Sequence, residues 1–545
     1  MHPASIARVY SNIPSQTGGR GTREAGSLAK RVAIIGAGMG GLAAAIRLRL
    51  MGFEVEVFEK NGQPGGRVGR LRENGFTFDT GPTLLLMTDV YRDLFAAAGR
   101  NLDEEIELVN LDPNYRVHFG DGDSIKVSSS LPALIPELER IEPGVTPRFY
   151  RFMQDACLKY RLGRSEFVER DFEKAGAFFG PRNLKLLLKT RAVNNYYRSV
   201  SKFFKTEKLR QTFSFQTMYL GLSPFEAPAV YALLPYTELA EDGLWFPRGG
   251  MYELVEAMVR LAHDLGVDIN LNSPAEEIVV ADGRARGVHV NGEEVGTDAV
   301  LANADLPYVY RKLLPRSAGE GDFRWKLRKR EKLLYTASSF MLYLGLDREL
   351  DHMSHHNVYL SARYRENFEQ IFSERRLPDD PSFYTNVPSR TDENAAPPGM
   401  EALYVLVPTP HLGENVDWER ESGPFKERVY DLLEKKANIP NIRRHIVYEK
   451  VKTPLDWLAD YNLEEGAAFG IGHGIFQVGY FRPPLASKTV RGVYFVGAST
   501  RPGTGVPLVT IGAKLAAERI GRDLGRSPVT RKVAGTNAET NAGVS

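Results

Sequence analysis

The chain has 545 residues, of which 43% are hydrophobic and 25% charged, an ordinary globular composition. A chain of this length is too long to fold around one small hydrophobic core, so we expect more than one domain. A formal net charge of +2 gives no general reason to expect nucleic acid as a partner, and a single cysteine, Cys157, excludes internal disulfides and cysteine-rich metal sites. No apolar run approaches the roughly 18–20 residues that span a bilayer.

Both ends of the chain are polar. Residues 1–30 carry arginine and lysine among serine, glycine and threonine, a composition that transit peptides share. We favour a disordered tail there, because no clear amphipathic face is present. Residues 528–545 are rich in glycine, asparagine and threonine and are also predicted to be disordered.

The first ordered elements predict a strand, a glycine turn, a helix and a second strand, at residues 31–35, 36–41, 42–51 and 53–59. The spacing Gly36-x-Gly38-x-x-Gly41 is a weak signal when it stands alone. Here it follows a strand and opens a helix, and Glu59 ends the next strand, 21 residues after Gly38. Together these features indicate a dinucleotide-binding unit.

Each residue of this fingerprint has a physical role. Gly36 permits a tight turn, Gly38 lets the backbone approach a diphosphate, and Gly41 lets helix and strand pack closely. The start of the helix offers unpaired N–H groups to the phosphates. Glu59 can accept hydrogen bonds from both ribose hydroxyls, and its charge disfavours a 2′-phosphate.

Further along the chain the predicted elements are mixed. Helical patterns and strand patterns alternate irregularly, and Asn291-Gly292 between two strand-like runs predicts a hairpin turn. We expect helices at residues 131–163, 183–215, 252–265 and 511–524, and strands at 267–271, 277–280, 285–290, 334–347, 402–408 and 492–497.

Two further glycine-rich segments decide which dinucleotide is bound. Gly65, Gly66 and Arg67 follow Glu59 closely, and a loop between the last strand and the last helix contains Gly497, Gly503, Gly505 and Val506. This combination resembles the flavin amine oxidase superfamily. The resemblance implies FAD as cofactor, with Arg67 at the diphosphate or the flavin edge and the C-terminal loop beside the flavin.

From about residue 31 to 522 the chain resembles the bacterial-type phytoene desaturases of carotenoid synthesis. The motifs that carry this resemblance are 213–215, 243–250, 302–305, 362–365, 407–412 and 480–483. The segment 497–502 reads Gly-Ala-Ser-Thr-Arg-Pro, where typical members have Gly-Ala-Gly-Thr-His-Pro, and the segment 470–480 around His473 also differs. The exact carotenoid therefore stays open.

The resemblance implies an α/β fold in which a Rossmann-like FAD-binding domain is interleaved with a mixed α+β substrate domain. We expect the FAD-binding domain to comprise residues 31–115, 246–310 and 486–527, and the substrate domain to comprise 116–245 and 311–485.

Desaturation removes two hydrogens from a hydrocarbon, one as hydride to flavin N5 and one as a proton. An acyclic carotene has no polar group to which a protein could hydrogen-bond, so we expect an apolar tunnel to bind it. The aromatic and aliphatic side chains that could line this tunnel are Phe213, Phe215, Met218, Tyr219, Trp245 and Phe246. Taken singly, a residue of this kind is more often plain core than tunnel wall.

The polar residues in the specific motifs are weak catalytic candidates, because a structural hydrogen bond is at least as good an explanation for each. They are Arg248, Arg365, His411 and Arg482. A second cluster, His352, His355 and His356, resembles a metal site, but it lies in a polar segment without supporting carboxylates. We interpret this cluster as a solvated loop and expect no metal.

Residues 182–210 contain nine cations against one acid, interleaved with leucine and aromatic residues. This pattern favours an interfacial helix on anionic lipid, with a solvated helix face as the alternative. Because the substrate is available only from membranes, we expect a cytoplasmic protein bound peripherally to the inner face of the membrane. Nothing else in the chain supports nucleic acid, and quinone or oxygen is the expected electron acceptor.

Other functions of the same scaffold remain open at this point. They are a carotenoid isomerase, a carotenoid oxygenase, an amine oxidase, and a prenyl-binding or GDP-dissociation-inhibitor protein without flavin chemistry. The intact Gly65-Gly66-Arg67 turn and the full terminal loop argue against the last class.

Overall fold

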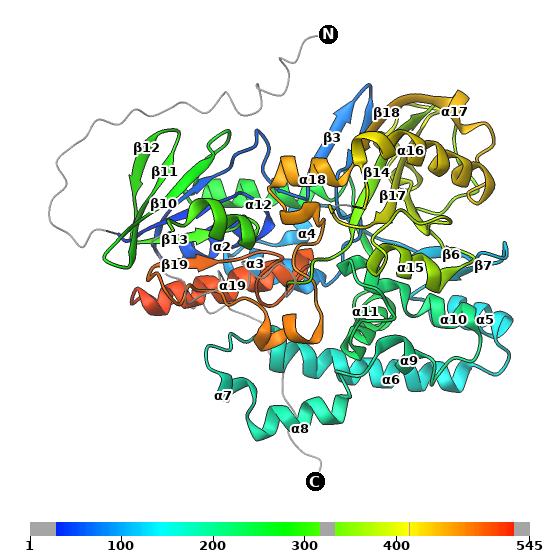
Figure 1. The fold of residues 1–545 in the computed structure, drawn as a ribbon, viewed down its shortest axis with the longest axis horizontal. Helices are drawn as coiled ribbons and strands as arrows, with labels where there is room; N and C mark the ends of the chain where they lie inside the picture. Colours follow the sequence, from blue (N-terminus) through cyan, green and yellow to red (C-terminus); the bar gives the residue numbers. More distant parts are fainter. Residues whose placement is uncertain (1–28, 317–332, 414, 528–545) are drawn as a thin grey trace.

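The computed structural model describes residues 29–316, 333–413 and 415–527. Apart from residues 29 and 30, the tails expected at 1–30 and 528–545 lie outside these ranges. In Figure 1 the parallel sheet and its helices form the left side of the molecule, and a larger sheet forms the right side. A layer of helices lies below both. The expected α/β fold class, with a parallel sheet and a separate mixed sheet, is confirmed.

Within the described residues, the parallel sheet has five strands from distant parts of the chain. Their order is β19 (Val493–Phe495), β13 (Ala299–Ala302), β1 (Arg31–Ile35), β2 (Glu54–Phe58) and β9 (Asp268–Asn270). All neighbouring pairs are parallel. The carboxyl ends of β1, β13 and β19 therefore meet at one edge, which is where such sheets bind ligands.

Helices cover one face of this sheet and a small antiparallel sheet covers the other. The helices α2 (Met39–Leu50), α3 (Thr88–Ala97), α12 (Tyr252–Asp264) and α19 (Val506–Asp523) contribute to one core. The small sheet consists of β10 (Ala275–Ala281), β11 (Arg284–Val290) and β12 (Glu293–Gly296). Its predicted hairpin is confirmed, with left-handed φ angles of 51° at Asn291 and 78° at Gly292.

The larger sheet has seven strands in the described residues. Their order is β18 (Ile446–Lys452), β14 (Ser338–Leu346), β17 (Glu401–Thr409), β16 (Phe383–Asn386), β15 (His356–Tyr359), β6 (Tyr115–His118) and β7 (Ser124–Val127). Only the pairing of β15 with β6 is parallel. α16 (Trp418–Lys435) packs on one face, and the other face contacts Phe76 and Phe78.

Short ribbons and helices connect these layers. The ribbons pair β3 (Arg70–Glu73) with β4 (Phe76–Asp79) and β5 (Leu108–Asn110) with β8 (Trp245–Pro247). The connecting helices are α4 (Leu102–Glu105), α13 (Leu306–Tyr308), α15 (Tyr364–Phe372), α17 (Ile442–His445) and α18 (Pro454–Tyr461).

The helical layer differs from the prediction because turns interrupt both expected helices. Residues 131–163 form α5 (Leu131–Ile141) and α6 (Thr146–Gly163), and Gly144 between them has φ 75°. Residues 183–215 form mainly α8 (Pro181–Thr190), α9 (Tyr196–Val200) and α10 (Glu207–Thr212). Arg191 ends α8 in the left-handed region, and the side chain of Asn195 caps α9. The layer also contains α7 (Ala175–Phe178) and α11 (Leu233–Tyr236).

The prediction of a solvated loop at the histidine cluster is wrong for two of its three members. His356 begins β15 and is fully buried, and His355 beside it is also buried. Strands β16 and β6 flank β15, so these imidazoles lie inside the larger sheet. His352 contacts the carbonyl oxygen of Ala437. Among the described residues, no group of three His, Cys, Asp or Glu side chains is arranged to hold a metal ion.

Candidate functional site

A cavity of about 750 Å³ extends between the parallel sheet, the helical layer and the larger sheet. Its walls include the glycine turns after β1 and β2, the start of α19, and side chains from β14, β16 and β17. Most of this surface is apolar. We call the part formed by the glycine turns with Glu59, Arg67 and Asp305 the cradle. We call the largely apolar remainder, which also includes Lys159, Arg164 and Arg170, the tunnel.

The first glycine turn has the geometry of a diphosphate cradle. Gly36 has φ 98°, and a Cβ atom on Gly41 would lie 2.1 Å from the carbonyl oxygen of Gly36, so helix and strand touch. Gly36 and Gly38 line the cavity, while Gly41 packs behind them. α2 starts at Met39 with no side-chain cap and no acidic residue in its first turn. Its first N–H groups and the positive end of its dipole therefore face the cavity.

Glu59 lies at the end of β2, is buried, and lines the same cradle. One carboxylate oxygen accepts a hydrogen bond from the N–H of Ala37 at 2.8 Å, and the other from the N–H of Asn61 at 3.0 Å. These bonds fix the carboxylate in place, and each oxygen keeps a second lone pair for a ligand hydroxyl.

The second glycine turn closes over the first. The N–H of Gly65 donates to the carbonyl oxygen of Ala37 at 2.8 Å, and Gly66 and Arg67 line the cavity. The Arg67 guanidinium donates to the carbonyl oxygen of Ala468 at 2.8 Å. Burial lowers the pKa of Arg67, and the nearby Asp305 carboxylate opposes that shift.

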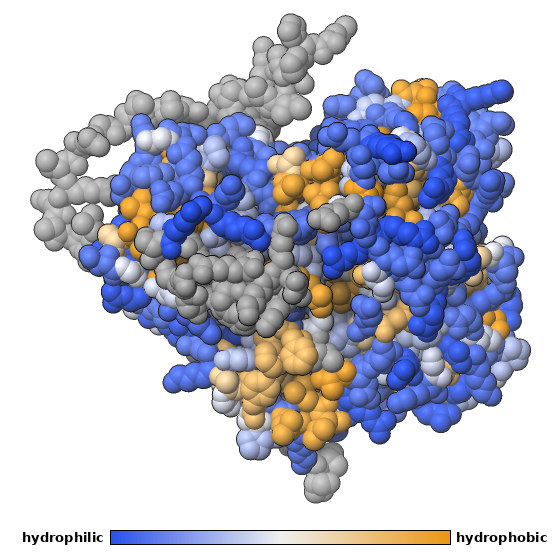
Figure 2. All heavy atoms as spheres, in the orientation of Figure 1, coloured by the Kyte–Doolittle hydropathy of each residue, from blue (hydrophilic) through white to orange (hydrophobic). Residues whose placement is uncertain are grey.

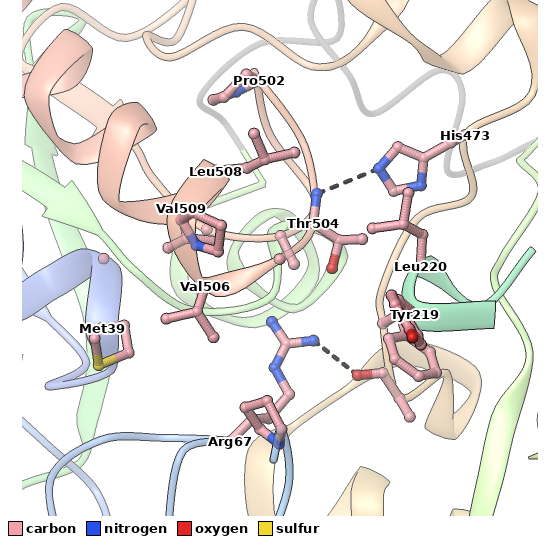
Figure 3. A pocket seen from close by; sticks show the side chains of 18 of the residues that line it. Met39, Arg67, Tyr219, Leu220, His473, Pro502, Thr504, Val506, Leu508 and Val509 are labelled. Carbon is pink, nitrogen blue, oxygen red and sulfur yellow. Dashed lines mark hydrogen bonds between the residues drawn. The ribbon is translucent and has the colours of Figure 1, made fainter. Parts of the chain in front are cut away.

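The C-terminal loop brings a second helix start to the cradle. Gly497, Gly505 and Val506 line the cavity, and α19 starts at Val506 with no side-chain cap and no acid in its first turn. Gly503 lies beside His473, whose Nε2 accepts a hydrogen bond from the N–H of Thr504 at 3.2 Å. Figure 3 shows this bond and the start of α19 opposite Arg67.

These groups fit FAD. Two uncapped helix starts and one guanidinium supply donors and positive potential for a diphosphate, and a fixed carboxylate supplies acceptors for a ribose. A Cβ atom on Gly38 would lie 2.9 Å from Nδ2 of Asn303, so the glycine allows the close packing of these two cavity-lining residues.

Four weak catalytic candidates make structural contacts, and none is among the described residues that line the cavity. Arg248 pairs with Glu107 at 2.8 Å, and the guanidinium of Arg365 lies 3.9 Å from the ring centre of Phe225. Nδ1 of His411 contacts the carbonyl oxygen of Leu412. Arg482 is buried and donates to five backbone carbonyls, those of Ile471, Gly472, Gln477, Ala498 and Thr500.

Sequence reasoning found part of the apolar wall. Phe215, Met218 and Tyr219 line the cavity, and the other three candidates, Phe213, Trp245 and Phe246, do not. Sequence reasoning did not single out Asn303 and Asp305 as site residues, although both line the cradle. They follow β13, and their position at the carboxyl end of a parallel strand was the available signal.

The tunnel leads away from the cradle to the surface at α7 and α8. Phe179, Val193 and Phe481 line the cavity and are also solvent-exposed. Leu188 and Phe476 extend this surface, with 72% and 77% of their area exposed. Figure 2 shows an apolar patch on this part of the molecule. Such a patch at a cavity mouth is typical of an interaction site.

Comparison with known proteins assigns the class. Residues 39–521 match the family described as flavin-containing amine oxidoreductase, and the chain belongs to this family. It is 45% identical to the zeta-carotene-forming phytoene desaturase of Myxococcus xanthus, over 90% of this chain and 94% of that protein. It is 38% identical to the 4,4'-diapophytoene desaturase of Staphylococcus haemolyticus, over 90% and 99%.

A crystal structure of an oxidoreductase from Methanosarcina mazei shares the fold, with a TM-score of 0.59 and 17% identity over 90% of this chain and all of that one. The chain is thus a flavin-dependent oxidoreductase of this family, as its sequence motifs predicted.

Proposed function

We propose that this protein is an FAD-dependent carotenoid desaturase that introduces conjugated double bonds into phytoene or a related acyclic carotene. The observation that carries the proposal is the continuity of one cavity from the FAD cradle, through an apolar tunnel, to an exposed apolar surface. A small polar amine would not need this length of apolar wall. A long hydrocarbon does, since its affinity comes from apolar burial.

The chain's own residues would hold the cofactor and shape the reaction. The N–H groups at the starts of α2 and α19, with Arg67, would bind the diphosphate and the flavin ring, and Glu59 would bind the ribose. FAD, when bound, supplies the hydride acceptor. The apolar side chains of the tunnel would exclude water from the hydrocarbon.

The test is expression in a host that makes phytoene, followed by extraction and mass analysis of the carotenoids. A desaturase yields products with two hydrogens fewer for each new double bond. An isomerase leaves the mass unchanged and an oxygenase adds oxygen, so either result would reject the proposal. Re-oxidation requires an acceptor, and anaerobic assays with and without a quinone separate quinone from oxygen.

We further propose that the patch formed by Phe179, Leu184, Leu188, Val193, Phe476 and Phe481 docks on an anionic membrane; we call it the α8 patch. These six residues are between 38% and 77% exposed. Lys185 and Lys189 of α8, which also carries Leu184 and Leu188, are exposed as well. Apolar groups flanked by lysines suit the interface of an anionic bilayer. Docking there would open the tunnel directly to the acyl chains that dissolve the substrate. No helix in the described ranges is long and apolar enough to cross a bilayer.

A further inference from the structure

A short series of hydrogen bonds connects the apolar tunnel to the interior of the larger sheet. Oγ1 of Thr83 lies 2.6 Å from Oη of Tyr384, and this oxygen lies 2.7 Å from Nδ1 of His356. Thr83 and Tyr384 line the cavity, whereas His356 is fully buried behind them in β15. The flavin-binding motifs include none of these three residues, and a polar series of this kind in an apolar wall requires an explanation.

The direction of these bonds follows from their donors. The amide nitrogen of Asn386 can only donate, and it lies 3.3 Å from Nδ1 of His356, so Nδ1 is an acceptor. Burial, with His355 alongside, holds the pKa of His356 well below its ordinary value, so the imidazole is neutral and carries its proton on Nε2. Tyr384 therefore donates to His356 and can accept from Thr83.

The tyrosine lies close to the cofactor cradle. The ring of Tyr384 is 5.9 Å from that of Tyr404, whose hydroxyl donates to the carbonyl oxygen of Gly81 at 2.8 Å. A Cβ atom on Gly81 would lie 2.0 Å from the carbonyl oxygen of Arg67, so the segment that carries Thr83 touches the second glycine turn. The Tyr384 hydroxyl thus belongs to the tunnel wall next to the cradle.

We propose that Tyr384, backed by His356, accepts the proton that the hydrocarbon loses during desaturation. This inference rests on the proposed desaturase function. One C–H bond breaks and its electron pair leaves as hydride to the flavin. The neighbouring C–H bond breaks, its electrons form the new π bond, and its proton goes to Oη of Tyr384 while the tyrosine's own proton passes to Nδ1 of His356. The hydrocarbon loses two electrons and the flavin gains two.

The chemistry does not require a strong base. Loss of hydride from an allylic carbon makes the adjacent C–H bond strongly acidic, so an oxygen whose proton can move to an imidazole is adequate. The proton is not retained on His356, since burial disfavours its charged form. Nε2 of His356 has no hydrogen-bond partner among the described residues, so the series ends at this imidazole. The proton therefore returns through Tyr384 to the cavity after the product leaves, and is released there to water.

The variants that test this are Tyr384→Phe, which removes the accepting oxygen, and His356→Asn, which keeps a hydrogen-bonding group near Nδ1 without its basicity. Tyr343→Phe is the matched control, because its hydroxyl donates to the carbonyl oxygen of Thr80 at 2.9 Å and Tyr343 is not among the described cavity-lining residues. The measurements are bound FAD, the rate of flavin reduction in anaerobic single turnovers with phytoene, and the isotope effect of deuterium at the carbon that loses the proton.

We expect full FAD content in all three variants. Tyr384→Phe and His356→Asn should slow flavin reduction by about 10²-fold, the lower range for a positioned proton acceptor. Their isotope effect at the proton-losing carbon should rise, since proton loss then limits the rate. Tyr343→Phe should change neither quantity.

Each other outcome rejects the inference at a different level. If the wild-type protein reduces no flavin with any acyclic carotene, the proposed function fails and this inference fails with it. Wild-type rates in Tyr384→Phe and His356→Asn would overturn the proton path alone and leave the desaturase function standing. A slower rate with an unchanged isotope effect, or an equal loss in Tyr343→Phe, would assign the effect to packing.

Discussion

Gly38 tests the diphosphate cradle at the scale of one residue, because its φ of −69° is accessible to any residue. Replacement by valine therefore adds volume without backbone strain at that φ. The new Cβ would meet Nδ2 of Asn303 at 2.9 Å, and Gly65 and Gly66 lie 3.9 Å away, so the added side chain would displace residues that line the cavity. We expect Gly38→Val to be purified without FAD, as read from the flavin absorbance of the folded protein. Gly423→Val is the control, since no atom lies within 4 Å of a Cβ there. A Gly38→Val protein with stoichiometric flavin would falsify the assignment of the fingerprint.

Glu59 should contribute to both cofactor binding and folding. Its two carboxylate oxygens accept hydrogen bonds from the N–H groups of Ala37 and Asn61. In Glu59→Gln the side-chain NH₂ group would replace one of these oxygens, so that two donors would face each other. We expect FAD binding to weaken by about 1–3 kcal/mol, the range for a charge-assisted hydrogen bond. Reconstitution of the apoprotein gives the dissociation constant, and urea unfolding of the apoprotein gives the stability. An unchanged dissociation constant with lower stability would make Glu59 a purely structural residue.

Residues joined by local spacing were predictable, and residues joined by tertiary folding were not. Gly36, Gly38 and Glu59 lie in one strand–helix–strand unit, whose spacing identifies them without any fold. Asn303 reaches the same cradle from β13, and Nδ2 of its side chain donates to the carbonyl oxygen of Gly36 at 3.2 Å. That contact depends on the pairing of β1 with β13, which local spacing does not encode.

At the scale of elements, α8 should be the membrane contact, and charge reversal tests it. Each lysine near an anionic surface contributes about 1 kcal/mol, which salt screens. Lys185→Glu with Lys189→Glu should weaken binding to anionic vesicles by about tenfold or more, by sedimentation, with FAD content intact. Leu188→Ser should weaken binding in a way that depends less on salt, because it removes apolar insertion.

The control for this experiment is the same charge change elsewhere in the basic stretch. Lys202 and Lys205 lie in the sequence between α9 and α10, and neither belongs to α8. Reversal of both to glutamate should leave more vesicle binding than reversal of the α8 pair. Equal losses in the two double variants would mean that net charge, and not the α8 patch, controls the attachment.

Helices and strands with a clear hydrophobic periodicity were predicted closely, whereas the ends of other elements were not. The helix expected over 252–265 is α12 at 252–264, and the strand expected over 402–408 is β17 at 401–409. The last helix begins at Val506, five residues before the expected start at 511, because Pro507 fits the first turn of a helix. His355 and His356 were placed wrongly because burial beside β16 and β6 outweighs their local polarity.

At the scale of the whole molecule, the candidate site exists only where distant segments meet. The cradle combines the turns near residues 36–41 and 65–67 with the loop near 497–506, and the tunnel adds strands from the larger sheet. The first glycine motif followed from local spacing, and the roles of Gly65-Gly66-Arg67 and the C-terminal loop followed from a family resemblance. The proton path did not, because pairing of β15 with β16 brings His356 and Tyr384 together, and Thr83 reaches Tyr384 from a distant segment after β4.

The stability of the whole molecule should depend on pH through Glu238, a fully buried carboxyl group. Tyr115 donates to it at 2.9 Å, and its other close neighbours, Tyr219 and Gln216, are neutral as well. Burial raises its pKa from 4.5 to about 7, so the folded state binds this proton more tightly than the unfolded state. Between those two pH values the free energy of unfolding therefore falls as the pH rises.

Glu238→Gln mimics the protonated side chain and should remove this contribution. We expect the variant to exceed the wild type in free energy of unfolding at about pH 8 by on the order of 3 kcal/mol, and to match it near pH 4. Urea unfolding at a series of pH values measures both curves. Some pH dependence should remain in the variant, because burial also raises the pKa of Asp79 to about 7. If the two proteins lose stability in parallel from pH 4 to 8, Glu238 is not protonated in the folded state and the hydrogen bond from Tyr115 must stabilise a buried anion.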